Sequence, residues 1–115
     1  MKVSNITKKK SLSIPLELAS TVQARLRGLM FRKACIPLLF VFPQEGIWPI
    51  HSFFVSFPFD AIYLGSEKKV ASVFESVPPF TLSLPPSIPS KYLLELAPGS
   101  AKKLDAKIGD KFSWG

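Results

Sequence analysis

The chain has 115 residues, of which 47% are hydrophobic and 20% are charged, and its formal net charge is +7. This length and composition exclude a disordered chain and are typical of one globular domain. We therefore expect a single domain over residues 1–115. Its residues 1–10 would form a basic N-terminal segment or edge strand, and residues 11–115 would form a β-rich core.

The whole excess of positive charge lies in the first third of the chain. Residues 1–33 contain eight basic side chains and one acidic one, whereas residues 34–115 contain seven of each. Such a surface would attract phosphate, RNA or an acidic partner, or it would serve only as a solvated, solubilising segment. The residues that would bind nucleic acid are Lys8, Lys9, Lys10 and Arg27.

The lone cysteine and the absence of a long apolar run limit the classes of protein. Cys35 has no partner for an internal disulfide, and it has no basic neighbour that would make it a reactive thiol. Prolines interrupt the apolar region 34–59 below the ~18 residues that a membrane span needs. We expect a soluble cytoplasmic protein, either a monomer or a weak homodimer, with no membrane partner.

The first predicted elements are a strand and a helix. Residues 11–18 alternate between apolar and polar side chains, which predicts a half-buried strand, and Pro15 places that strand at a sheet edge. Residues 20–23 resemble a capping box, and residues 22–30 place an apolar stripe on one helical face. This would be the main amphipathic helix. Gly28 either ends it early or leaves a gap where a backbone or small anion can approach.

The segment 50–64 is expected to organise the fold as a core hairpin. It contains two predicted strands, 51–57 and 61–64, which follow another apolar strand at 38–42 and its loop 43–46. A polar turn at 65–69 would make the next strand, 70–74, pair antiparallel with the preceding one. These strands together predict a meander.

The last third contains a proline-rich loop and two further strands. Prolines exclude a regular ladder over 77–89, which is expected to be an extended loop or, alternatively, a groove for a peptide. Residues 91–96 predict a strand, 100–104 a helical turn, and 107–114 a turn followed by a closing strand. The fold class is therefore mostly β, an antiparallel sandwich with one main helix and a short C-terminal helical turn.

The residues do not form a familiar catalytic pattern. His51 and Asp60 could act as a base and its orienter, but strands that pair around residues 57–58 would hold them far apart. An aspartate after a proline turn commonly accepts backbone N–H bonds. The chain has no phosphate-binding loop, no serine-nucleophile motif and no zinc-protease motif. We expect no metal and no cofactor, and we regard an enzyme as the weaker interpretation.

The order of several motifs resembles the domain of unknown function 192 family, DUF192. These motifs are Arg25-x-x-Gly28-Leu29-Met30-Phe31-Arg32, Leu39-Phe40-Val41-Phe42, His51-Ser52-x-x-x-x-Phe57-Pro58-x-Asp60, Tyr92-x-Leu94-Glu95-Leu96-x-x-Gly99 and Gly109-Asp110. The third motif is similar to the archaeal members. The resemblance implies a jelly-roll-like sandwich with one main helix and no established activity.

Three functional hypotheses follow. The first is a noncatalytic module that binds a small anionic or polar ligand at a sandwich edge. Its candidate residues are His51, Arg25, Arg32, Asp60 and Trp48. The second is association with nucleic acid through the basic first third. The third and weakest is a hydrolase-like enzyme with His51 as its base.

Overall fold

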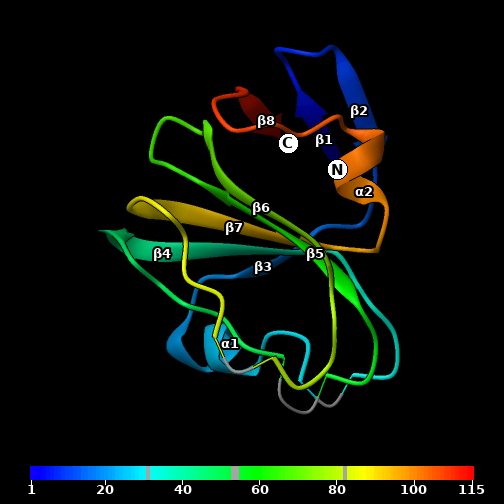
Figure 1. Cartoon of the computed structure of the whole chain (residues 1–115), viewed down its shortest axis with the longest axis vertical. Helices are drawn as coiled ribbons and strands as arrows, with labels where there is room; N and C mark the ends of the chain where they lie inside the picture. Colours follow the sequence, from blue (N-terminus) through cyan, green and yellow to red (C-terminus); the bar gives the residue numbers. More distant parts are fainter. Residues whose placement is uncertain (31, 53–54, 82) are drawn as a thin grey trace.

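In the computed structural model of the protein, residues 1–30, 32–52, 55–81 and 83–115 are described, without the side chains of Val22 and Leu26. Within these ranges the chain is mostly β, with two sheets and two short helices. Figure 1 shows the larger sheet in the middle of the molecule, with other elements on both of its faces. The predicted mostly β class is confirmed.

The larger sheet has five strands in the order β3, β4, β7, β5, β6. Their bounds are Glu17–Ala19 (β3), Leu38–Gly46 (β4), Ser90–Leu96 (β7), Phe59–Leu64 (β5) and Val70–Val77 (β6). Only β3 and β4 pair in parallel, and the other neighbours are antiparallel. Strand β5 is buried along its whole length because the sheet is covered on both faces.

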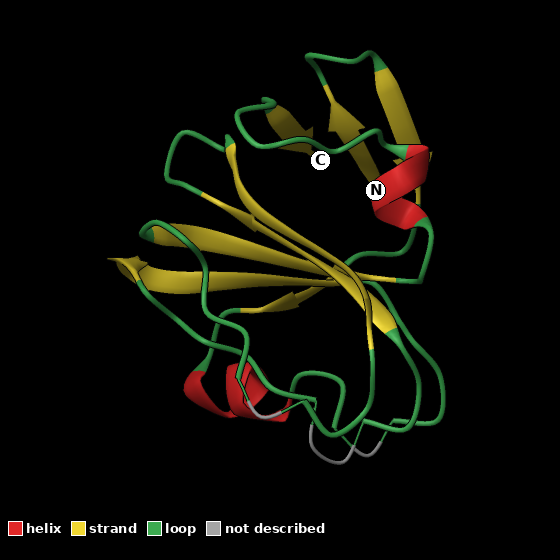
Figure 2. Cartoon of the chain, viewed as in Figure 1, coloured by secondary structure: helices red, strands yellow, loops and turns green. Residues whose placement is uncertain are grey.

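The smaller sheet covers one face of the larger one. It consists of β2 (Lys10–Ser13), β1 (Lys2–Asn5) and β8 (Phe112–Trp114), in that order. The short helix α2 (Ser100–Lys103) lies on the same side of the larger sheet, whereas helix α1 (Val22–Arg27) lies on the opposite side (Figure 2).

Two hydrophobic cores result from this layering. Alternate residues of β5 serve both of them, since Ile62 packs between the sheets and Tyr63 packs on the side of α1. Leu94 and Leu93 of β7 divide in the same way. The larger sheet is therefore the shared wall of two separate cores.

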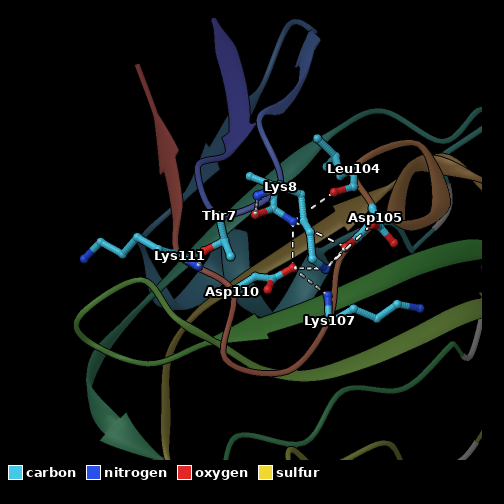
Figure 3. A network of polar contacts seen from close by, with 8 residues as sticks. Thr7, Lys8, Leu104, Asp105, Lys107, Asp110 and Lys111 are labelled. Carbon is cyan, nitrogen blue, oxygen red and sulfur yellow. Dashed lines mark hydrogen bonds and ion pairs between the residues drawn. The ribbon is translucent and has the colours of Figure 1, made fainter.

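A buried carboxylate ties the smaller sheet to the segment that follows α2 (Figure 3). Asp110 accepts hydrogen bonds from the Asn5 amide (2.8 Å), from Lys8 Nζ (3.1 Å) and from the backbone N–H of Lys107 (3.1 Å). Burial opposes the charged form, but these hydrogen bonds hold the pKa of Asp110 below its usual value. The network fixes the turn between β1 and β2 against the turn before β8.

The predicted single strand over residues 11–18 is wrong. The chain leaves the smaller sheet after Ser13 and enters the larger sheet at Glu17, because Pro15 cannot donate a ladder hydrogen bond. Leu18 is 59% exposed, although the alternation predicted a buried side chain. Strand β1 is also not an edge strand, since β2 and β8 flank it.

The predicted hairpin over 50–64 is only half correct. Its second half forms β5, but within the described residues of 51–57 there is no strand, and residues 53 and 54 lie outside the described part. The backbone N–H of Ser52 donates to the carbonyl of Thr81 (3.0 Å) in the proline-rich loop, so this segment pairs with a loop and not with a β5 ladder. The predicted antiparallel pairing of β5 with β6 is confirmed.

Helix α1 is shorter than the predicted amphipathic helix. Gly28 ends it, with φ +48° and ψ −125°, which is the first of the two alternatives that the sequence left open. The C-terminal helical turn and the strand predicted at 91–96 are confirmed as α2 and β7, whereas 43–46 belongs to β4 and is not a loop. No helix in the described ranges combines the length and apolar character needed to cross a membrane.

Candidate functional site

A cavity of about 120 Å³ lies between α1, residues 49–51 with Val55, and the face of the larger sheet on the side of α1. Its described walls are mainly apolar, and its polar side chains are few. The described residues that line it are Arg25, Arg27, Gly28, Leu29, Met30, Phe40, Pro49, Ile50, His51, Val55, Phe59 and Glu95. Small-ligand sites commonly combine apolar walls with a few convergent polar groups.

Gly28 allows the chain after α1 to pass close to the sheet. A Cβ atom at this position would lie 3.1 Å from Phe40 Cζ and 3.7 Å from Glu95 Oε1. Its φ of +48° also belongs to the region that side chains with a Cβ rarely adopt. A glycine here therefore satisfies both the backbone conformation and the close approach to the Phe40 ring.

Glu95 is the buried polar group of the cavity. It lies on β7 opposite Leu38 of β4 and Ala61 of β5, and it is only 4% exposed. Among the described residues, Glu95 Oε1 has no hydrogen-bond partner. Burial raises the pKa of the Glu95 carboxyl from 4.5 to about 8, so the carboxyl is mostly protonated at neutral pH.

Three basic side chains are among the described residues that line the cavity. Arg25 is held in place because its Nη1 donates to the carbonyl of Ser20 (2.6 Å). Arg27 is exposed in the last turn of α1, and no hydrogen bond or ion pair joins its side chain to the described part of the chain. His51 is exposed on the segment opposite the helix. We refer to Arg25, Arg27 and His51 together as the basic rim.

Two buried hydroxyl groups fix the segment that carries His51. The Ser52 hydroxyl donates to the carbonyl of Pro78 (2.6 Å) and accepts from the backbone N–H of Thr81 (2.6 Å). The Tyr63 hydroxyl donates to the carbonyl of Trp48 (2.5 Å). Burial, with a smaller effect from Glu95, raises the pKa of Tyr63, so this hydroxyl stays neutral and keeps its proton for that bond.

Three of the residues proposed from sequence lie outside the cavity wall. Arg32 supports the wall, because its Nε donates to the carbonyl of Gly28 (3.0 Å) and its Nη2 forms an ion pair with Glu17 (2.6 Å). Trp48 stacks on Phe42 with ring centroids 5.2 Å apart. Of the five candidates, the cavity therefore brings together only Arg25 and His51.

Asp60 accepts hydrogen bonds from backbone N–H groups, which gives it a structural role. It is completely buried, and its carboxylate accepts from the backbone N–H groups of Ser76 (2.8 Å), Gly99 (3.1 Å) and Ala101 (2.9 Å). These bonds hold the start of α2 against β6. Asp60 is not among the described residues that line the cavity with His51.

The four residues of the nucleic-acid hypothesis do not share one surface. Lys8 lies by the smaller sheet, paired with Asp110 (3.1 Å) and Asp105 (3.6 Å). Arg27 belongs to α1, on the other side of the larger sheet (Figure 1). Lys9 and Lys10 are exposed near Lys8. The described residues also contain no group of three or more metal-binding side chains.

The family model of DUF192, described as "Uncharacterized ACR", matches residues 3–114. The chain belongs to the DUF192 family. A UPF0127 protein of Pyrococcus furiosus is 33% identical over 112 residues, which cover 96% of this chain and 95% of that relative. The expected similarity to archaeal members is confirmed.

Two solved structures share the fold of this DUF192 protein. One, from Novosphingobium aromaticivorans, is described as a protein of unknown function. Its TM-score is 0.84 at 26% identity, and the match covers 98% of this chain and 82% of that one. The other, a proposed transcription regulator of Sinorhizobium meliloti, has a TM-score of 0.87 at 25% identity. The match covers 97% of this chain and 91% of that one.

The sequence interpretation of this DUF192 chain missed Glu95 as a site residue. A signal was present, because Glu95 is the only charged residue in the apolar run 92–96, where a strand between two others should have no free carboxylate. The sequence predicted that Gly28 either ends the helix or leaves a gap for a backbone or small anion; in the structure the Phe40 ring and then Glu95 lie nearest to it.

Proposed function

We propose that this DUF192 protein binds a small anionic molecule in the cavity between α1 and the larger sheet, without transforming it. The observation that supports this proposal is the basic rim, because two arginines and a histidine line a cavity whose other described lining residues are apolar apart from Glu95. Arginine is well suited to carboxylate and phosphate groups because its guanidinium offers several donors in one plane.

The size of the cavity limits the ligand. Its volume of about 120 Å³ is somewhat smaller than that of a cavity of ~150 Å³ that holds benzene. The enclosed part of the ligand should therefore have roughly six non-hydrogen atoms. A carboxylate or phosphate group could remain at the rim, where it stays partly hydrated.

Support for the nucleic-acid alternative is weaker. The description of the Sinorhizobium meliloti protein as a proposed transcription regulator favours it. The separation of Arg27 from Lys8, and the ion pairs of Lys8 with two aspartates, count against a continuous basic surface. Binding of RNA or DNA that weakens steeply with rising salt would support this alternative.

The hydrolase alternative has lost its original acid–base pair, since Asp60 is held by backbone N–H groups away from the cavity. Glu95 shares the cavity with His51 and has a raised pKa, which is a feature of many catalytic acids. Release of product from a small ester or amide by the wild type, abolished in His51→Ala, would favour catalysis over binding alone.

Thermal unfolding with a panel of small anions tests the proposal. Acetate, propionate, butyrate and inorganic phosphate should be compared with chloride at constant ionic strength. A ligand at ten times its Kd stabilises the folded state by about 1.4 kcal/mol. For a domain of this size, that should raise the Tm by about 6 °C.

Two matched variants locate the binding. Arg27→Gln should weaken binding about tenfold, because it removes a charged donor from the rim. Lys102→Gln removes an equally exposed cation from the last turn of α2, and it should leave binding unchanged. Equal weakening by both variants would reduce the effect to net charge, and no stabilisation by any of these anions would contradict the proposal.

A further inference from the structure

The Glu95 carboxyl gives the cavity a second polar end. Arg27 and His51 of the basic rim are exposed and so lie where the cavity meets solvent, whereas Glu95 of β7 is only 4% exposed and is buried near Gly28. Its Oε1 accepts no hydrogen bond from the described residues. A buried carboxyl oxygen without a donor is costly, and a ligand that supplies the donor removes that cost.

The other titratable groups near Glu95 do not supply a positive charge. Tyr63 of β5 and Cys35 have pKa values raised by burial, and both are neutral at physiological pH. The cations that line the cavity are Arg25 and Arg27, and neither contributes to the pKa shift of Glu95, which burial alone causes. The cavity therefore combines a buried carboxyl with positive charges on its more exposed side.

A ligand with two charged ends of opposite sign complements this arrangement. We propose that the cavity binds a small amino acid whose carboxylate lies at the basic rim and whose ammonium group donates to the Glu95 carboxylate. This inference rests on the proposed function and specifies its ligand class. A sphere with the volume of the cavity, 120 Å³, would be about 6 Å across. A β- or γ-amino group, which two or three carbons separate from the carboxylate, can therefore reach the buried end.

The proton on Glu95 is displaced when an ammonium group binds. In the empty cavity the carboxyl has a pKa of about 8. Ionising it at pH 7 lowers the binding constant about tenfold, since one pH unit is a factor of ten. The charge-assisted bond to the ammonium group, shielded from water, favours the ionised form. Binding should therefore release protons near pH 7 and should become tighter as the pH rises toward 8.

Calorimetric titration with matched probes tests this inference. The probes are β-alanine and γ-aminobutyrate, compared with propionate and butyrate, which have the same chain lengths but no amino group. We expect each amino acid to bind the wild type about tenfold more tightly than its matched carboxylate. Titrations in two phosphate-free buffers of different ionisation enthalpy should show proton release with the amino acids and none with the carboxylates.

Glu95→Gln is the decisive variant because it keeps the shape of the side chain and removes its charge. In this variant the amino acid and its matched carboxylate should bind equally, without proton release. The control is Glu75→Gln, which changes an exposed glutamate on β6 and should behave as the wild type.

The outcomes separate this inference from the proposed function. Equal binding of amino acids and matched carboxylates to the wild type would overturn the amino-acid inference and leave anion binding intact. A preference for amino acids that persists in Glu95→Gln would overturn the role of Glu95. If none of the four probes binds at any pH from about 6 to 9, the amino-acid inference is wrong. Inorganic phosphate would then still test the rim by itself.

Discussion

Replacing Glu95 with glutamine should stabilise the protein at neutral pH. In the folded state burial raises the pKa of this carboxyl from 4.5 to about 8, whereas in the unfolded state it titrates near 4.5. The folded chain therefore holds a proton that the unfolded chain has lost. The stability that comes from the neutral carboxyl is complete below pH 4.5 and is lost as the pH rises through the folded-state pKa.

The magnitude follows from the pKa difference. Each pH unit between the two pKa values costs about 1.4 kcal/mol, so at pH 7 the wild type should be less stable than near pH 4.5 by about 3 kcal/mol through this group. Above pH 8 the cost approaches about 5 kcal/mol. Glutamine is neutral at every pH and nearly isosteric, so Glu95→Gln should avoid this loss.

Urea unfolding at several pH values from about 5 to 8 measures the effect. The free energies of unfolding of the wild type and Glu95→Gln should nearly coincide at the acidic end and separate by about 3 kcal/mol at pH 7. The control, Glu75→Gln, should follow the wild type, because its carboxylate is exposed. Parallel curves for the wild type and Glu95→Gln would show that the reasoning about Glu95 is wrong.

Three further predictions concern other parts of the chain. Gly28→Ala should cost about 1–3 kcal/mol in urea unfolding, from positive φ and crowding, and Gly109→Ala, which has φ +92° but open space around it, should cost less. Equal costs would exclude crowding as the cause. Asp110→Asn should lower stability at neutral pH by about 1–3 kcal/mol, because a buried network loses its charge. Folding lowers the pKa of Asp110, so the stability difference between wild type and Asp110→Asn should persist above pH 3.8 and shrink as the pH falls through the folded-state pKa. Asp105→Asn, at a side chain that is 48% exposed, should change stability little. Cys35 has a pKa of about 11, so at pH 8 iodoacetamide should alkylate it about a hundredfold more slowly than after unfolding in urea; equal rates would contradict its burial.

Sequence patterns predicted the strands that have apolar side chains on a regular period. Strands β5, β6 and β7 were predicted correctly because each contains a run of apolar residues. These residues fill the two cores on either side of the larger sheet. The segment 51–57 has the same apolar character, but among its described residues the backbone of Ser52 bonds to the loop around Thr81, and the N–H of Val55 donates to Ser52. A periodic pattern indicates which side chains are buried, but it does not indicate which segment accepts or donates the backbone hydrogen bonds.

The candidate site was predicted only in part. Arg25 was singled out with Arg32 on the flank of the apolar helical stripe, and His51 as the only histidine; Arg25 and His51 both line the cavity. Asp60 was singled out as well, but it accepts three backbone N–H groups. Glu95 was missed because its strand matched the apolar pattern so well that the exception was taken as part of a family motif. A charged residue at a position that should be buried is the stronger signal.

The larger sheet separates a structural core on one side from the cavity on the other. On one side, the smaller sheet and α2 close a core whose residues have no part in the cavity, and Asp110 and Asp60 fasten the ends of that layer. On the other side, the cavity is lined by α1, by residues 49–51 and by Val55. Replacing residues 49–51 with those of related chains should consequently alter which molecules are accepted while the scaffold beneath stays intact. The protein is thus a convenient frame for transplanting recognition loops.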